Sequence, residues 1–389
     1  MTSEIKKGVY RQIAPLTLIR TVLNTGFRMI YPFQPFFMEE LGIGLGEMTR
    51  MLAGRSLVGI FSPLTASVAD SRGRKTGMLL GVTLFSLGAL IFLFWTTGGG
   101  LLAFLLLSTI GKAIFDPSLQ AYFGDRVPYS RRGFVLALTE MSWSGAFFLG
   151  VPLVGFLIRK SGLTAPFLGI TVLGAVSFLV IVFLIPADPL PEQDRPGLMQ
   201  NFWTVFSSRA ALAGLMVSLL IAAANEVVNV VFGVWLNDSF SLQIAALGGA
   251  SAVIGLSELI GEGAVSAVSD VLSKKKAVFW GALANSGAAL SLILLGRVQW
   301  GAVLGLFLFY LTFEFTIVSA IPLMTGVVPE ARATMMALNI ASVSLGRGLG
   351  SLAAAPLYSR GFLFNAVAGA LINLLALIAL RLVIVKEKG

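Results

Sequence analysis

The 389-residue chain contains neither cysteine nor histidine. The absence of cysteine excludes disulfide bonds and thiol catalysis. Without histidine, any exchange of protons near neutral pH falls to Asp and Glu. The phosphate-binding patterns GxxxxGKS and GxxxxGKT are also missing, so the sequence does not indicate ATP-driven work. No serine-centred catalytic group stands out, and we therefore predict that the protein is not an enzyme and needs no metal or cofactor.

Charged residues are scarce. They make up 12% of the chain, against about 25% in soluble proteins. Hydrophobic residues make up 56%, and the mean hydropathy is +0.88. A soluble core could not bury this much apolar surface, so the surrounding solvent must be lipid. The apolar runs are continuous and do not alternate, which excludes a β-barrel and predicts an all-α polytopic membrane protein.

Each membrane-spanning helix needs roughly 20 apolar residues, and the sequence contains twelve such runs separated by loops. The first run contains Arg20 and Arg28, and we interpret it as a retained span and not as a cleaved signal peptide. The predicted spans are 13–37, 47–69, 76–95, 101–123, 134–158, 163–185, 210–236, 244–269, 277–296, 300–325, 333–358 and 362–385.

The basic residues are distributed unevenly between the loops. Eighteen lie in one alternating set, and the other set holds only Arg159, Lys160, Arg297 and Arg360. Positive charge marks the cytoplasmic side, so we predict that both termini are cytoplasmic and that the protein spans a cell membrane, in the manner of a prokaryotic inner-membrane protein. The net charge of +9 then points to membrane lipids as partners and not to nucleic acid. We expect a monomer.

The longest loop, 186–209, carries four prolines that prevent a regular helix in its first part. After them, Leu198, Phe202, Val205 and Phe206 share one helical face. This spacing predicts a short amphipathic helix on the cytoplasmic surface. The predicted organisation is therefore an N-terminal six-helix bundle over 1–185, a linker over 186–209 and a C-terminal six-helix bundle over 210–389.

The two halves share short loop sequences. The residues SVAD at 67–70 close the second span, and AVSD at 267–270 closes the eighth, 200 residues later. The dipeptide Val-Pro at 127–128 follows the fourth span and returns at 328–329 after the tenth, 201 residues later. Two loops that repeat at nearly one offset indicate an internal duplication.

The loop after the second span reads ADSRGRKTG. Asp70 ends a helix, where a carboxylate opposes the helix dipole and needs a partner. Gly73 would let the chain turn tightly enough to bring Arg74 back toward it. This D-x-x-G-R-K pattern, which includes Lys75, resembles the signature loop of the major facilitator superfamily. The sequence has Ala66 where that pattern has glycine.

The resemblance covers the whole chain, because it includes the six-plus-six spans, the cytoplasmic termini, the long central loop and VPYSRRG at 127–133. It implies two pseudo-symmetric six-helix bundles that provide alternating access to a substrate. It also implies a gating role for Asp70, Gly73, Arg74 and Lys75.

The fifth span contains Gly150, Pro152 and Gly155. Close helix packing and a proline kink explain this pattern fully. The pattern is also similar to the Gly-Pro signature of the drug–proton antiporters of the same superfamily, although Val151 stands where that signature has glycine. The resemblance favours export. The superfamily's arginine in the fourth span is absent, because Leu107 occupies the matching position.

Ionisable groups deep in a span cost roughly 2.5–3.5 kcal/mol each and are functional candidates. The first half has Arg20, Arg28, Arg55, Lys112 and Asp116, and the second has Glu226, Glu258, Glu262, Glu314 and Arg347. The first half has an excess of positive charge and the second an excess of negative charge. This predicts that the charged groups of the two halves face each other across a central aqueous cavity. The predicted substrate and proton cavity consists of Asn24, Arg28, Asp116, Glu226, Asn229, Glu258, Glu262, Glu314 and Arg347.

Several of these charges have simpler interpretations. We expect Arg20 to snorkel to the cytoplasmic surface, and Lys112 and Asp116 can neutralise each other within one helix. Glu140 lies close in sequence to Arg131 and Arg132. This proximity predicts an ion pair in the loop that carries the two arginines.

The second-half carboxylates are harder to explain as structural groups. Glu258 and Glu262 are one turn apart and repel each other, so at least one should hold a proton near neutral pH. Glu226 or Glu314 would exchange a proton for substrate, while Arg28 or Arg347 could be a structural counter-ion.

These features together predict a proton-coupled transporter that exports amphipathic or cationic small molecules. A carrier of a zwitterionic or lipid-like substrate fits the charge distribution about as well. Nutrient uptake and a receptor without transport are further alternatives.

Overall fold

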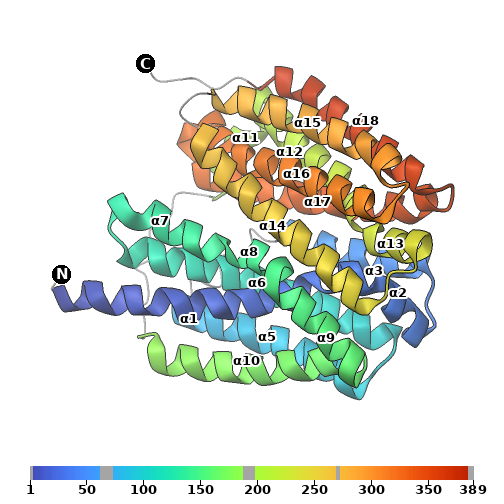
Figure 1. Ribbon diagram of the computed structural model, residues 1–389. Helices are drawn as coiled ribbons and strands as arrows, with labels where there is room; N and C mark the ends of the chain where they lie inside the picture. Colours follow the sequence, from blue (N-terminus) through green and yellow to red (C-terminus); the bar gives the residue numbers. More distant parts are fainter. Residues whose placement is uncertain (1–2, 62–72, 187–197, 269–271, 384–389) are drawn as a thin grey trace. The chain divides into compact units, whose positions relative to one another are not determined.

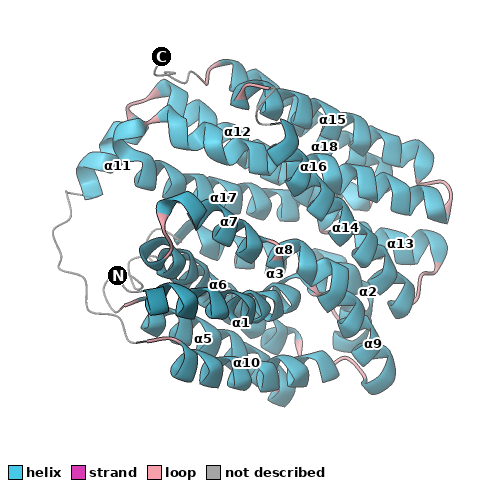
Figure 2. Ribbon diagram, turned by 60° about the vertical axis from the view of Figure 1, so that its left-hand side comes forward, coloured by secondary structure: helices cyan, strands magenta, loops and turns pink. Residues whose placement is uncertain are grey.

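The computed structural model describes residues 3–61, 73–186, 198–268 and 272–383, and within these residues the chain is helical and contains no strand (Figures 1 and 2). The helices of the first part are α1 (Ser3–Arg28), α2 (Ile30–Leu41), α3 (Leu45–Val58), η1 (Gly59–Phe61), α5 (Arg74–Phe94), α6 (Gly98–Arg126), α7 (Tyr129–Glu140), α8 (Ser142–Gly145), the π-helical turn η2 (Ala146–Gly150), α9 (Val151–Ser161) and α10 (Ala165–Leu184).

The helices of the second part are α11 (Leu198–Phe206), α12 (Arg209–Asn229), α13 (Phe232–Phe240), α14 (Ile244–Val268), α15 (Lys274–Leu295), α16 (Gln299–Val327), η3 (Pro329–Ala331), α17 (Arg332–Tyr358) and α18 (Phe362–Arg381). Over the described residues, helices occupy all twelve predicted spans, which confirms the all-α fold class. The predicted linker helix is α11, and its Val205 is buried in the core while Trp203 is 75% exposed.

Local chemistry explains where two spans are interrupted. The first span breaks at Met29 between α1 and α2, because in a continuous helix the ring of Pro32 would clash with the carbonyl group four residues earlier. The fifth span widens into the π-helical turn at Ala146–Gly150, directly before Pro152, which has no N–H to donate to the preceding turn.

Nine described segments are long and apolar enough to span a membrane on hydropathy alone. The predicted spans outside this set correspond to α1 with α2, α3, and α17. The helix α3 is described over only 14 residues, whereas Arg20 in α1 and Arg347 in α17 lower the mean hydropathy of those helices.

The chain forms two compact units. Unit 1 comprises residues 1–43, 64–193 and 244–255, and unit 2 comprises 44–63, 194–243 and 256–389. Unit 2 thus includes α3, which packs against α17. The helix α14 divides between the units after Gly255. The division into six-helix bundles over 1–185 and 210–389 stays a prediction.

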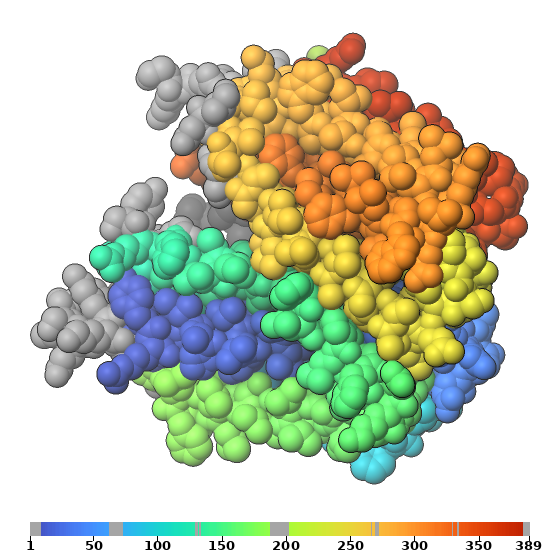
Figure 3. Space-filling model, viewed as in Figure 1, coloured from blue at the N-terminus to red at the C-terminus, as the bar shows by residue number. Residues whose placement is uncertain are grey.

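The core of unit 1 is rich in aromatic rings. Phe167 of α10 contacts Phe37, Phe92 and Phe104, with ring centroids 4.2–6.0 Å apart. The helices α5, α6 and α10 lie side by side (Figure 1). Figure 3 shows α10, in light green, at the surface of the unit, where most of its apolar side chains are uncovered, as expected for a helix that faces lipid.

The core of unit 2 combines apolar packing with buried amides. The helix α12 packs against α17 and α18, and α15 packs against α16 and α18. Asn285 of α15 donates to the carbonyl of Phe309 at 2.7 Å and accepts from the amide of Asn373 at 2.7 Å. Such hydrogen bonds between spans satisfy polar groups that lipid cannot solvate, and so connect α15, α16 and α18.

Glycines determine how closely α5 and α6 approach. A Cβ atom on Gly111 would lie 2.5 Å from the carbonyl oxygen of Gly81. We predict that Gly111→Val destabilises the protein by about 1–3 kcal/mol, because the two backbones would have to separate. Thermal unfolding in detergent tests this. The matched control is Gly124→Val on the same helix, where a Cβ meets nothing within 4 Å. Equal losses in both variants would contradict the account.

The predicted topology can be tested by chemical labelling, because the chain has no native cysteine. Ser207 follows α11 and Arg360 precedes α18. In intact cells we expect a membrane-impermeant maleimide to label Arg360→Cys and to leave Ser207→Cys unlabelled until the membrane is permeabilised. The reverse pattern would invert the topology derived from the basic loops.

Candidate functional site

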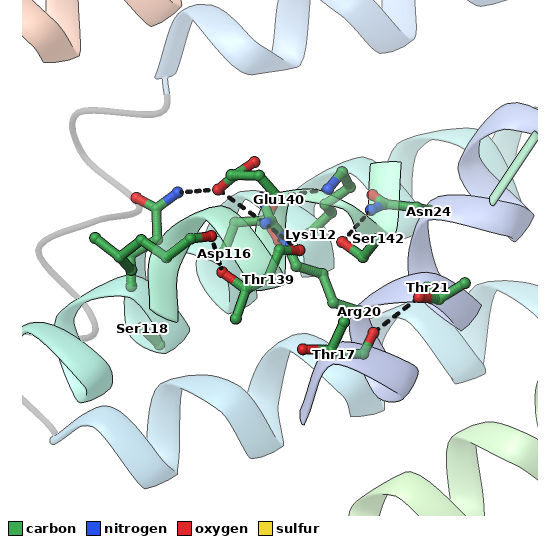
Figure 4. A network of polar contacts seen from close by, with 12 residues as sticks. Thr17, Arg20, Thr21, Asn24, Lys112, Asp116, Ser118, Thr139, Glu140 and Ser142 are labelled. Atoms are coloured by element: carbon green, nitrogen blue, oxygen red, sulfur yellow. Dashed lines mark hydrogen bonds and ion pairs between the residues drawn. The ribbon is translucent and has the colours of Figure 1, made fainter. Parts of the chain in front are cut away.

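A cluster of four charged side chains lies inside unit 1 (Figure 4). Arg20 of α1 contacts Asp116 of α6 at 3.0 Å and Glu140 of α7 at 2.8 Å. Lys112 donates to the second oxygen of Asp116 at 2.5 Å. The guanidinium group of Arg20 also donates to the backbone carbonyl of Thr139 at 3.0 Å. Two cations and two carboxylates thus neutralise each other and connect α1, α6 and α7.

This cluster corrects two predictions. Arg20 does not snorkel to the surface, because the residue is only 5% exposed and its head group is held by two carboxylates. Glu140 pairs with Arg20 and accepts from Gln120 at 3.0 Å, whereas the prediction paired it with Arg131 or Arg132. The side chain of Arg132 lies outside the described part of the chain. The predicted pairing of Lys112 with Asp116 is confirmed.

Two further predicted residues of α1 lie on the same face as Arg20, one and two turns farther along the helix. Asn24 is fully buried and donates to the hydroxyl of Ser142 at 3.0 Å. Arg28 is 3% exposed and donates to the carbonyl of Trp143 at 2.8 Å. Its guanidinium carbon lies 3.6 Å from the ring centroid of Phe147, a cation–π contact.

In unit 2, a chain of hydrogen bonds ends on Glu226 of α12. Tyr310 of α16 donates to Asn229 at 2.5 Å, and the amide of Asn229 donates to Glu226 at 3.1 Å. Ser351 of α17 donates to the other carboxylate oxygen at 3.4 Å. Glu226 is only 1% exposed.

The other predicted acids of unit 2 lie on α14 and α16. Glu258 and Glu314 are 1% and 6% exposed, and Glu262 is half-buried. The helices α14 and α16 approach each other closely at this point. A Cβ atom built on Gly261 of α14 would lie 3.1 Å from the Cβ atom of Glu314 on α16. Arg347 of α17 is half-buried. Unit 2 therefore brings three buried carboxylates and one half-buried carboxylate into one helical unit.

Arg55 also belongs to unit 2, although its position in the sequence assigns it to the first half. Its side chain is fully buried on α3, the helix that packs against α17. The sequence predicts that the charges divide between its two halves. Their division between the two compact units is different, because Arg55 lies in unit 2.

The gating loop is described in part. Asp70 lies outside the described residues. Gly73 has φ +91°, a conformation that favours glycine, directly before α5. Arg74 contacts Asp125 at 3.2 Å, and Lys75 donates to the carbonyl of Val182 at 2.7 Å. These contacts fix the beginning of α5 within unit 1, and the gating role stays a prediction.

The glycines of the antiporter-like segment allow close packing. A Cβ on Gly150 would lie 2.0 Å from the hydroxyl oxygen of Thr25, and one on Gly155 would lie 3.0 Å from the ring of Phe33. Pro152 lies 3.3 Å from a Cβ built on Gly248 of α14. The packing explanation is thus sufficient for these residues, and a role in coupling stays a prediction.

Sequence reasoning gave Glu140 the wrong partner and did not include Tyr310 and Ser351 among the site residues. Tyr310 precedes Glu314 by one helical turn, a spacing that could have indicated it. Arg20 and Glu140 are far apart in the sequence, so no local spacing reports their contact.

The comparisons with known proteins agree with this architecture. The chain belongs to the Major Facilitator Superfamily, whose model matches residues 16–351. The MFS-type transporter YceJ of Bacillus subtilis is 24% identical over 90% of this chain and 89% of its own length. The multidrug resistance protein MdtG of Proteus mirabilis is 26% identical over 55% of each chain, and the efflux pump PmrA of Streptococcus pneumoniae is 26% identical over 40% of each.

Solved structures show the same fold. A bacterial homologue of the human lysosomal transporter Spinster aligns with a TM-score of 0.76 over 98% of both chains, at 14% identity. The human organic anion transporter MFSD10 aligns with a TM-score of 0.70 over 95% of this chain and 98% of its own, at 18% identity. The protein is therefore a polytopic membrane transporter of this superfamily, with relatives among multidrug resistance proteins.

The buried charge cluster makes a prediction about stability. Asp116→Asn removes the carboxylate shared by Arg20 and Lys112 and leaves excess positive charge among the spans. We expect a loss of about 3–5 kcal/mol in the free energy of unfolding, measured by chemical denaturation in detergent. The control is Asp125→Asn, which breaks the exposed pair with Arg74 and should cost no more than about 1 kcal/mol. Equal effects would show that the cluster is not a structural requirement.

Proposed function

We propose that the protein is a proton-coupled exporter of amphipathic cations, with Glu226 as the group that exchanges a proton for the substrate. The observation that carries the proposal is the burial of Glu226 on α12, where its carboxyl group accepts from Ser351 of α17 and from Asn229, at the end of the chain of hydrogen bonds that begins at Tyr310. Protonation removes the charge that is costly in the membrane, and a bound cation would compensate it instead.

The other acids of unit 2 support a cationic substrate. Glu258 and Glu314 are buried in the same unit, and Glu314 lies one turn from Tyr310. A concentration of carboxylates attracts positive charge. The relatives that are multidrug resistance proteins and the antiporter-like segment at Gly150–Gly155 support export. Transport would proceed by alternating access.

The test uses proteoliposomes that contain a trapped pH-sensitive dye. We expect tetraphenylphosphonium, a lipophilic cation, to release protons from wild-type protein, and Glu226→Gln to lose this response, because the amide cannot exchange a proton. Glu314→Gln tests the second candidate acid in the same assay. The matched control is Glu47→Gln, an exposed acid on α3, which should behave as wild type. Proton release that persists in both Glu226→Gln and Glu314→Gln would overturn the assignment.

A carrier of zwitterionic or lipid-like molecules is the second candidate. The buried Arg28, packed against Trp143 and Phe147 in unit 1, favours it. Such a site could hold an anionic head group next to aromatic surface. Movement of a labelled lysolipid that displaces no protons, in the same proteoliposomes, would favour this candidate over the exporter.

A further inference from the structure

A cavity of about 370 Å³ lies within unit 2, at the end where α3 begins and α17 finishes. Its polar wall includes Thr49, Arg50, Tyr358 and Ser359, and Leu352 and Pro356 form part of its apolar wall. In the predicted topology this is the outer end of both spans. The cavity therefore lies at the depth where lipid head groups meet acyl chains.

Arg50 is the charged residue of the cavity lining. Its side chain is exposed, and among the described residues no carboxylate forms an ion pair with it. The neighbouring hydroxyl groups donate elsewhere: Thr49 to the carbonyl of Gly46 at 3.2 Å, and Tyr358 to the carboxylate of Asp238 at 2.8 Å. The guanidinium is thus the group of the lining that can attract an anion.

Two acids belong to the same end of the unit. Glu47 is exposed one turn before Arg50 on α3, and Asp238 of α13 accepts the hydroxyl of Tyr358. The apolar side of the cavity is accessible, because Leu352 is 45% exposed and Leu349, one turn earlier on α17, is 48% exposed. A ligand that fits both walls has an anionic head and an apolar tail.

We propose that this cavity binds the phosphodiester head group of an outer-leaflet phospholipid, with Arg50 on the phosphate and an acyl chain along Leu352. Guanidinium groups bind phosphate oxygens in a bidentate manner. Burial of methylene groups against the apolar wall adds affinity that a free anion would not gain. The bound lipid would connect α3 with α17. This site is separate from the carboxylates of the proposed transport mechanism, so the two proposals can fail independently.

The test is a titration of the purified full-length protein in detergent with dioleoyl phosphatidylglycerol, followed by the thermal unfolding midpoint. We expect a saturable rise for wild type. Arg50→Gln should weaken the apparent affinity about tenfold, because a charge-assisted hydrogen bond is lost. Ala355→Trp, which fills the cavity from another lining position, should abolish the rise. Without lipid, Arg50→Gln should unfold near the wild-type temperature, because Arg50 is exposed.

The matched control is Arg297→Gln, an exposed cation in the predicted outer loop between α15 and α16, which should titrate as wild type. A second arm replaces the lipid with inorganic phosphate, which should not raise the midpoint at equal concentration. Stabilisation by inorganic phosphate as strong as that by the lipid would show a free-anion site and overturn the lipid assignment. Identical lipid titrations for wild type and Arg50→Gln would overturn the site.

Discussion

The cost of placing charge in a membrane constrains this protein more than any other factor. An ionised group deep in a span is stable only when other groups of the protein replace the water that it has lost. The Arg20 cluster shows one way to meet this requirement, because two cations and two carboxylates from α1, α6 and α7 compensate each other at 2.5–3.0 Å. The arrangement of these helices therefore depends on the pairing of their charges.

The chain to Glu226 shows a second way. Asn229 and Ser351 donate hydrogen bonds to the carboxyl group of Glu226, which is almost completely buried, and Tyr310 donates to Asn229. We infer that the Arg20 cluster supports the structure, and we propose that Glu226, at the end of this chain of hydrogen bonds, is the group that exchanges a proton.

Much of the fold could be predicted from the sequence, because long apolar runs report membrane spans directly. Even the short helix α11 was indicated by the spacing of Leu198, Phe202, Val205 and Phe206. The pairing of Lys112 with Asp116 was predictable because the two residues are one helical turn apart. The partners of Arg20 were not, since Asp116 and Glu140 come from distant segments that only the folded chain brings together. The membership of α3 in unit 2, with the buried Arg55, was likewise a property of tertiary packing that hydropathy does not report.

The central claim is that Glu226 exchanges a proton for the substrate, and infrared difference spectroscopy tests it most directly. Spectra of the protein in lipid, with and without tetraphenylphosphonium, report the C=O stretching band of protonated carboxyl groups. The account predicts that this band loses intensity when the cation binds, and that Glu226→Gln lacks the change while it still folds. An unchanged band in wild-type protein that binds the cation, or an equal loss in Glu226→Gln, would contradict the account.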